Sequence, residues 1–266
     1  MKKIILEENI CQEMHKLYEN GYTREKLENK YGISGTVIIR IFKEHGWNFR
    51  PANYSKYKVN ENYFDNIDTH DKAYIVGLLF ADGCNHEERN TISLELQETD
   101  KDIVENINKI INIDRPIYYY NYVGKYGHKQ GTYTMLCCNK HISEQLHNLG
   151  MVKNKSLILD YPSWIDDELF PSLLRGYIDG DGWVSKKTIG FMSSDKFCYG
   201  VQEYLKDKLD IESKVMDMKR EYNEHTKTLY IANFMDKQRI SEIMFSNGQL
   251  KMQRKYDKYI YYSYLQ

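Results

Sequence analysis

Residues 171–182 read PSLLRGYIDGDG and residues 73–83 read AYIVGLLFADG, so this chain of 266 residues carries one pattern twice. Each copy is followed by alternating polar and apolar residues, then by Asp-Lys and a helical stretch. A repeat of this kind determines the fold prediction, because each copy must build the same supersecondary unit.

The remainder of each copy predicts the same succession of strands and helices, with the apolar periodicity changing between about 2 and 3.6 residues. After the first motif we expect strands at 91–97, 116–122 and 132–138 and a helix at 141–149; after the second we expect strands at 188–192, 214–222 and 227–234 and a helix at 236–245. The predicted fold class is α+β, with two pseudo-symmetric αββαββα repeats at 63–160 and 161–266.

The first 46 residues predict a small all-α module with the layout of a helix-turn-helix. Thr23 and Ser34 stand before the second and third helices as N-cap residues, and Gly32 provides the tight turn between them. The third helix would direct Thr36 and Arg40 toward a DNA major groove. A helical packing module without a nucleic-acid contact is the alternative. Residues 47–62 show no sustained periodicity and are interpreted as a linker.

Composition excludes several classes of protein. No apolar run approaches the roughly 20 residues of a membrane span, and the first residues lack the apolar stretch of a signal peptide. The five cysteines form no CxxC and suit reduced thiols in a cytoplasm. The net charge of −1 conceals two basic segments, because residues 1–60 and residues 214–258 each carry a net charge of +4. Local basic faces, rather than the total charge, govern nucleic-acid binding.

Small residues stand four apart in each motif, as Gly77 with Ala81 and as Gly176 with Gly180. On a helix this spacing places both on one face, so two backbones can approach closely. We therefore predict that the two motif helices pack on each other about a pseudo-twofold axis. The glycines that follow, Gly83 and Gly182, are expected to end the helices in the left-handed conformation.

Asp82 and Asp181 occupy positions that folding alone does not favour. A carboxylate at a helix C-terminus opposes the dipole by roughly 0.3–1 kcal/mol, and two adjacent carboxylates repel each other. A divalent cation reverses both effects, and the backbone carbonyls of Ala81 and Gly180 would complete a set of hard oxygen ligands suited to Mg²⁺ or Mn²⁺. An Asp-Gly pair that only terminates a helix is the alternative interpretation.

Residues 75–83 and 174–182 resemble the two nonapeptide motifs of LAGLIDADG homing endonucleases in their single-chain form. The eighth-position acids, Asp82 and Asp181, are both present; the sixth position holds Asp179 in the second motif but Phe80 in the first. The resemblance covers about residues 60–260. It implies that the two curved antiparallel sheets form a saddle over the DNA major groove, with the motif helices at its centre.

The resemblance also implies site residues. Lys155 and Lys255 are the candidates for a basic residue from each half near the attacking water, and Gln97 would orient solvent, with Met192 or Ser193 as its counterpart. Ser93 and Glu95 alternate with apolar residues on one strand and give it a polar face for DNA. The further expected DNA contacts are Arg115, Lys125, Lys129, Lys186, Lys187, Lys219, Arg220, Lys227 and Arg254.

The function implied is site-specific hydrolysis of double-stranded DNA by a monomer, on a long asymmetric target, leaving short 3′ overhangs. Such a protein would be cytoplasmic and nucleoid-associated, or encoded by a phage or another mobile element, and would have no membrane partner. Two alternatives remain open. One is an intron maturase that binds RNA, and the other is a non-catalytic transcriptional regulator.

Overall fold

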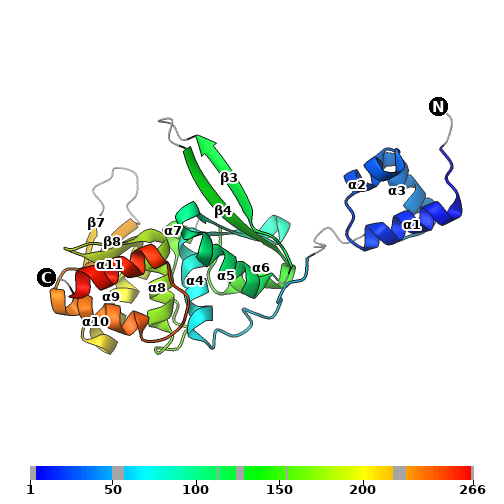
Figure 1. Cartoon of the computed structure of the whole chain (residues 1–266). Coiled ribbons are helices and arrows are strands. Elements are labelled where there is room, and N and C mark those ends of the chain that lie inside the picture. The colour runs from blue at the N-terminus through cyan, green and yellow to red at the C-terminus, as the bar shows by residue number, and fades with distance from the viewer. Residues whose placement is uncertain are drawn as a thin grey trace. The chain divides into compact units, whose positions relative to one another are not determined.

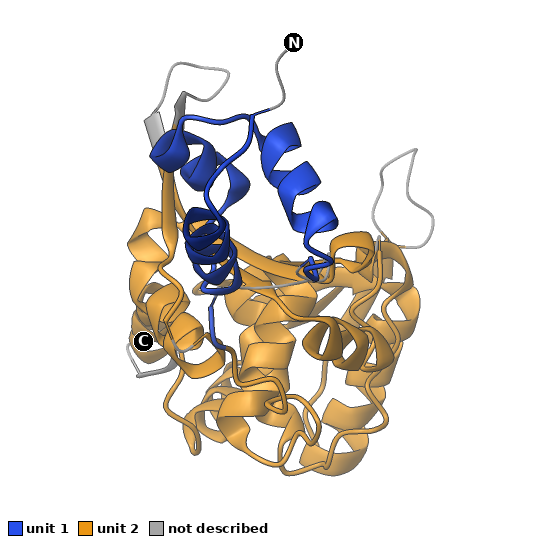
Figure 2. Ribbon diagram, turned by 90° about the vertical axis from the view of Figure 1, so that its right-hand side faces the viewer, with its two compact units in different colours: residues 1–58 blue, residues 59–266 orange. Residues whose placement is uncertain are grey.

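The computed structural model describes residues 4–49, 57–112, 114–123, 129–153, 155–217 and 226–264. The chain divides into two compact units, residues 1–58 and residues 59–266 (Figure 2). Within the described ranges, no helix combines the length and the apolar character that crossing a membrane requires.

The described residues of the first unit form three helices, α1 (Glu8–Glu19), α2 (Arg24–Tyr31) and α3 (Gly35–Glu44), around a core that includes Met14, Leu27 and Phe42. Thr23 caps α2, because its hydroxyl accepts from the Lys26 amide at 3.2 Å. Gly32 ends α2 with a φ of 65°. Ser34 stands at the N-cap of α3 but forms no capping hydrogen bond through its side chain, which corrects the prediction for this residue.

Both ends of the segment expected to be a linker take part in packing. Trp47 stacks on His15 and His45, with ring centroids 4.7 and 4.3 Å apart. Val59 pairs with Asn112 in an isolated antiparallel bridge of the second unit. The first unit therefore extends beyond residue 46, and the second begins before residue 63.

The second unit confirms the predicted order αββαββα in both repeats (Figure 1). The first repeat consists of α4 (His70–Asp82), β1 (Gly83–His86), β2 (Thr91–Gln97), α5 (Lys101–Ile111), β3 (Tyr118–Val123), β4 (Lys129–Cys138) and α6 (Lys140–Asn148). The second consists of α8 (Phe170–Asp181), β5 (Gly182–Val184), β6 (Ile189–Ser194), α9 (Asp195–Leu209), β7 (Lys214–Asp217), β8 (Thr226–Ile231) and α10 (Phe234–Phe245). The described part also contains the short helix α7 (Lys155–Ile158), the C-terminal helix α11 (Gln253–Tyr264) and the 3-10 turns η1 (Glu87–Arg89) and η2 (Glu98–Asp100).

The described strands form two four-stranded antiparallel sheets, with strand orders β1-β2-β4-β3 and β5-β6-β8-β7. Strand β8 ends at Ile231 rather than at the predicted residue 234. The reason is local: the Asn233 side chain accepts from the amides of Met235 and Asp236 and so starts α10 at Phe234.

The register relates the two repeats position by position. Gly83 pairs with Leu94, and Gly182 pairs with Phe191. Counting from these pairs, Glu95 corresponds to Met192, and Gln97 corresponds to Ser194. The expected counterpart of Gln97, Met192 or Ser193, was therefore wrong, since a slip of this kind moves a side chain along the strand or to its other face.

The motif helices α4 and α8 lie side by side at the centre of the unit (Figure 1). A Cβ at Gly77 would overlap the Leu173 carbonyl oxygen, and a Cβ at Gly176 would overlap the Tyr74 carbonyl oxygen. Backbones this close require glycine, as the four-residue spacing predicts. The same helices join the interiors of both repeats into one hydrophobic core.

The glycines that end α4 and α8 do not adopt the predicted left-handed conformation. Gly83 has φ −76° and ψ 157°, and Gly182 has φ −93° and ψ 177°, so each helix leads directly into an extended strand. Their requirement for glycine is steric. A Cβ at Gly83 would lie 2.7 Å from the Leu79 carbonyl oxygen, and one at Gly182 would lie 2.7 Å from the Ile178 carbonyl oxygen.

Candidate functional site

Asp82 and Asp181 are the last residues of α4 and α8, so the helix packing brings both carboxylates to one end of the pair. Asp82 crosses toward the other repeat, because a Cβ at Gly180 would lie 2.8 Å from Asp82 Oδ2. The same hypothetical Cβ would overlap that of Ala81. One alanine and one glycine thus fit face to face at this crossing, where two alanines would collide.

The environment of this pair disfavours negative charge. The protein around Asp82 removes much of its hydration, although part of the residue stays open to solvent. This loss of hydration, together with repulsion from Asp181, raises the pKa of Asp82 to about 6. Loss of hydration also raises the pKa of Asp181. Lys155 and Lys255 oppose these shifts. The stronger lysine effect on each aspartate comes from the lysine of the other repeat, so the two charge pairs cross the pseudo-twofold axis.

The two candidate lysines are held differently. Lys155, at the start of α7, donates to the Gly83 carbonyl at 2.6 Å and is half-buried. Lys255, on α11, is buried and donates to the carbonyls of Ile178, Gly180 and Gly182 at 2.7, 3.1 and 2.8 Å. Burial lowers the pKa of Lys155 and lowers that of Lys255 to about 8.

An ammonium group has three donors, and Lys255 directs all of them to the end of α8. In this geometry it caps the helix C-terminus and has no donor left for another ligand. The Gly180 carbonyl, predicted as a metal ligand, accepts from this cation. That contact argues against Gly180 as a ligand, because a metal ion would be placed beside a positive charge.

The two carboxylates nevertheless fit a divalent cation. Among the described residues there is no group of three or more His, Cys, Asp or Glu side chains placed to hold a metal. Mg²⁺ commonly binds through one or two carboxylates together with water and substrate phosphates. Asp82 and Asp181 supply such a pair, and a cation would relieve their repulsion and the adverse helix dipoles. Ala81, which precedes Asp82, remains the candidate for a backbone ligand.

A buried polar network, to which the sequence had assigned no role, holds the connection from α10 to α11. Asp179 Oδ2 accepts from the Tyr74 hydroxyl at 2.8 Å and from the Met252 amide at 2.9 Å. Burial raises the pKa of Asp179 to about 6. Arg175 donates to the carbonyls of Met244 and Asn247 at 2.5 and 2.9 Å. These contacts position the segment that carries Lys255.

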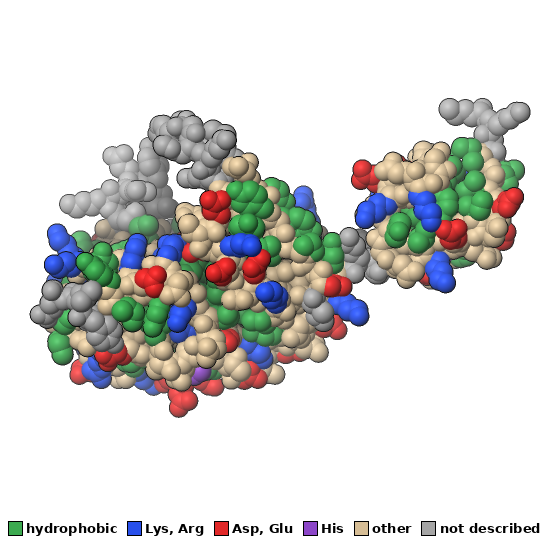
Figure 3. All heavy atoms as spheres, viewed as in Figure 1, with side chains coloured by type: hydrophobic (Ala, Val, Ile, Leu, Met, Phe, Trp, Pro, Cys, Tyr) green, Lys and Arg blue, Asp and Glu red, His purple; other side chains and the backbone are tan. Residues whose placement is uncertain are grey.

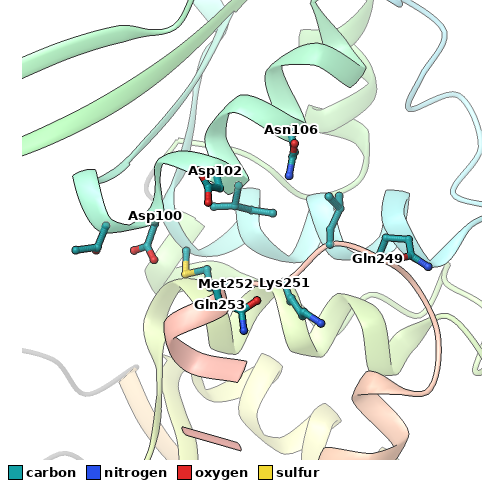
Figure 4. A pocket seen from close by; sticks show the side chains of 10 residues that line it. Asp100, Asp102, Asn106, Gln249, Lys251, Met252 and Gln253 are labelled. Atoms are coloured by element: carbon teal, nitrogen blue, oxygen red, sulfur yellow. The ribbon is translucent and has the colours of Figure 1, made fainter. Parts of the chain in front are cut away.

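The same connection also binds the first repeat. Asp71 Oδ1 accepts from the amides of Gln249 and Leu250 at 2.8 and 3.2 Å. Arg254 Nε lies 2.8 and 2.9 Å from the two oxygens of Asp100, which is buried, so this predicted DNA contact forms an intramolecular ion pair. Next to it, a polar pocket of about 260 Å³ lies between the start of α5 and residues 249–253 (Figure 4). The sequence contained one signal for the buried polar network around Asp179. The sixth motif position holds Asp179 in the second repeat and Phe80 in the first.

Strand β2 presents the polar face that its alternation predicts. Ile92, Leu94 and Leu96 are buried, whereas Glu95 and Gln97 are exposed. Ser93 lies on the same side as Glu95 and within 3.2 Å of His86 Nε2. Gln97 immediately precedes η2 at the end of β2. It lies beyond Leu94, the residue of β2 that pairs with Gly83.

The basic residues predicted to contact DNA are exposed, engaged in contacts within the protein, or outside the described residues. Lys186 and Lys187 are exposed in the turn between β5 and β6. Arg115 is half-buried, with Nη1 3.1 Å from Cys138 Sγ. Lys227 shares a strand face with the buried Leu229 and Ile231 and forms an ion pair with Asp217, which argues against the predicted DNA contact. Outside the described residues lie Lys125, Lys219, Arg220 and the side chain of Lys129.

In the first unit, the residues predicted to face DNA lie on α3. Thr36 is exposed near its start. Arg40 donates to the Ile4 carbonyl at 2.6 Å and lies 3.7 Å from Glu44. Arg40 is therefore engaged within its own unit. On the face of the molecule that Figure 3 displays, Lys and Arg side chains are interspersed with Asp and Glu side chains.

Comparison with known proteins identifies the second repeat. Residues 172–244 match the family model described as a LAGLIDADG-like domain, and this range contains Asp181. This match lies within the second repeat and agrees with the resemblance of its motif.

Several solved structures are similar to the chain. One is the homing endonuclease I-WcaI bound to its DNA recognition sequence, with 16% identity and a TM-score of 0.48 over 74% of this chain and 91% of that one. Others are the LAGLIDADG meganuclease I-AabMI bound to uncleaved DNA (10% identity, TM-score 0.45, 71% and 89%) and the N-terminal LAGLIDADG domain of DUF199/WhiA (16%, 0.44, 70% and 89%). No curated protein matches the sequence.

Proposed function

We propose that this protein is a site-specific endonuclease that hydrolyses both strands of double-stranded DNA with Mg²⁺ or Mn²⁺. The observation that carries the proposal is the pair Asp82 and Asp181, placed together at abutting helix ends where their charges repel. Folding gains nothing from this arrangement, whereas a metal-dependent reaction does. The LAGLIDADG-like domain at residues 172–244 supports the same conclusion.

The residues of the chain then have distinct roles in the reaction. A divalent cation held by Asp82 and Asp181 would supply Lewis-acid activation of the phosphodiester. A water oxygen attacks phosphorus and the bond to the 3′ oxygen breaks, leaving a 5′-phosphate and a 3′-hydroxyl. Lys155, half-buried beside the pair, stabilises the negative charge that develops on the phosphate. Lys255 fixes the end of α8 and hence the position of Asp181.

Because one chain contains two unequal repeats, a monomer would bind a long asymmetric target, one half-site for each repeat. Short 3′ overhangs follow from the resemblance of the motifs. The first unit would extend the contact along flanking DNA.

The test is cleavage selection from a randomised or source-genome DNA library with Mg²⁺. Asp82→Asn and Asp181→Asn should each lower the cleavage rate by at least about 10³-fold, since a catalytic metal contributes several kcal/mol to transition-state stabilisation. Both variants should still bind the selected DNA. Asp102→Asn, which changes an exposed acid on α5, is the matched control and should cleave normally. Sequence-specific binding without cleavage by the wild-type protein would refute the nuclease proposal and favour a regulator, and binding restricted to intron RNA would favour a maturase.

A further inference from the structure

The exposed faces of the two sheets differ chemically at equivalent positions. In the first sheet, a cross-strand row runs from Glu95 through Thr134 to Tyr118. In the second sheet, the corresponding row runs from Met192 through Thr228 to Met216. Repeat 1 thus presents a carboxylate where repeat 2 presents a thioether, and a second methionine replaces a tyrosine.

The neighbouring row of the second sheet extends this difference. A Cβ at Gly190 would lie 2.7 Å from Trp183 Cζ2 and 2.8 Å from Tyr230 Cβ, so the indole of Trp183 lies over this glycine. Trp183 Nε1 donates to Thr188 Oγ1 at 2.9 Å, and the Tyr230 hydroxyl donates to Met216 Sδ at 3.3 Å. The polar atoms of both aromatic residues therefore have partners within the protein. Trp183, Met192, Met216 and Tyr230 together form the apolar patch.

The first sheet carries hydrogen-bonding groups at the equivalent places. Cys84 and Ser93 correspond to Trp183 and Gly190. Ser93 Oγ lies within 3.2 Å of His86 Nε2, and Thr134 Oγ1 donates to Glu95 Oε2 at 3.4 Å. This face suits ligands with donors and acceptors rather than apolar groups.

The apolar patch is not required by the core. Phe191 and Leu229 alternate with its members and fill the other side of the sheet. Met192 is nevertheless 41% exposed, and Met216 is 54% exposed. They lie on either side of Thr228 in one cross-strand row, so the two exposed apolar side chains belong to one group. Single exposed apolar side chains are ordinary, whereas an adjacent group of them indicates a binding surface.

Charge at the edges of the patch indicates what covers it. Lys214 stands beside Tyr230 in the second row, and Lys186 and Lys187 are exposed in the β5–β6 turn. An apolar surface with lysines at its margin is complementary to a polyanion that displays apolar groups. The DNA major groove is such a surface, because each thymine presents its C5-methyl group there between two phosphate backbones.

We propose, on the basis of the proposed function, that the two repeats read their half-sites by different chemistry. Met192 and Met216 of repeat 2 contact thymine C5-methyl groups. Glu95 of repeat 1 accepts a hydrogen bond from the N4 amino group of cytosine, the base edge that suits a carboxylate. The target is accordingly asymmetric in composition, with thymine selected in one half-site and cytosine in the other.

The test replaces thymine by deoxyuridine in one half-site of the selected target at a time, which removes the methyl group but keeps base pairing. In the half-site contacted by repeat 2, each lost methyl contact should weaken binding about fourfold. The same replacement in the other half-site should change binding less than twofold. The double variant Met192→Ser/Met216→Ser should lose this sensitivity to deoxyuridine, and Glu95→Gln should retain it. Since both methionines are exposed, the melting temperature serves as the check that the variant folds.

The outcomes separate this inference from the function on which it rests. If the wild-type protein cleaves its target but deoxyuridine has no effect in either half-site, the methyl readout is refuted and the endonuclease stands. If the wild-type protein neither binds nor cleaves DNA, the proposed function itself fails. If the wild-type protein is a dimer that the double methionine variant converts to a monomer, the apolar patch is a self-association surface and the inference is overturned.

Discussion

The two repeats share a backbone plan but differ in what surrounds their aspartates. Both have the order αββαββα, the same sheet order and a glycine at the helix crossing. Repeat 1 contributes Lys155, which is bonded to one carbonyl, whereas repeat 2 contributes Lys255, which is bonded to three. The pseudo-symmetry therefore resides in close backbone packing, while the side chains have diverged.

The divergence extends behind the motif helices. The sixth motif position is Phe80 in repeat 1, where it is buried in the core, and Asp179 in repeat 2, where it binds the Met252 amide. Repeat 2 therefore anchors the C-terminal segment through polar contacts, and Lys255 depends on that anchor. We infer that Lys255 is mainly a structural residue and that Lys155 is the more available of the two for chemistry.

The largest expected effect on stability is the difference between the variants Lys255→Met and Lys155→Met. Loss of the Lys255 ammonium leaves three carbonyls without their partner, so the free energy of unfolding should fall by about 3 kcal/mol. Lys155→Met removes one such bond at a half-buried site and should cost about 1 kcal/mol. Urea unfolding followed by circular dichroism measures both.

Cleavage assays complete this comparison. Lys155→Met should slow cleavage at least tenfold at a temperature where it remains folded, and Lys155→Arg should restore part of the rate. Equal losses of stability in the two methionine variants would contradict the structural difference between the repeats.

Particular residues show which features the sequence could predict. Gly77 and Gly176 were found because the spacing that packs two helices is visible within one turn, and the β2 face was found because its alternation is local. The three carbonyl partners of Lys255 lie more than 70 residues away in the chain, and no local pattern encodes such a meeting. The counterpart of Gln97 was misplaced because pairing register depends on where β5 turns into β6.

Gly83 illustrates a different kind of failure. Its place after a helix correctly indicated a requirement for glycine, but the left-handed cap was the wrong reason. The actual cause is the direct passage from helix to strand, which brings Gly83 against the Leu79 backbone. Residue preference identified the position, and only packing supplies the physical explanation.

Substitutions of Gln97 and Ser194 should differ in stability by an intermediate amount, because these two equivalent positions have different roles in the two repeats. Ser194 is buried, donates to the Leu159 carbonyl and accepts from the Phe197 amide as the N-cap of α9. Ser194→Ala should therefore lower the free energy of unfolding by about 1–2 kcal/mol. Gln97→Ala, at an exposed position, should leave stability within about 0.5 kcal/mol of the wild type and lower only cleavage. A stability loss in Gln97→Ala equal to that in Ser194→Ala would remove this distinction.

The smallest expected effect is a gain in stability from Asp82→Asn in the absence of divalent metal. The folded-state pKa of Asp82 is about 6, against an ordinary value of 3.8, so the fold binds this proton more tightly than the unfolded chain does. The stabilisation from that proton is complete below about pH 4 and is lost as pH rises through 6. Because the carboxylate is partly exposed, the cost of its charge at pH 8 is only about 1 kcal/mol.

Asparagine carries no charge at any of these pH values. Asp82→Asn should thus unfold at higher urea concentration than the wild type at pH 8 with EDTA and at the same concentration at pH 3.5, while Asp102→Asn controls for the general loss of one acid. Addition of Mg²⁺ at pH 8 should raise the melting temperature of the wild type and not that of Asp82→Asn, because binding to the folded state alone stabilises it. A variant that is less stable than the wild type at pH 8 would show that Asp82 stabilises the fold, and would refute the interpretation of Asp82 and Asp181 as a repulsive pair.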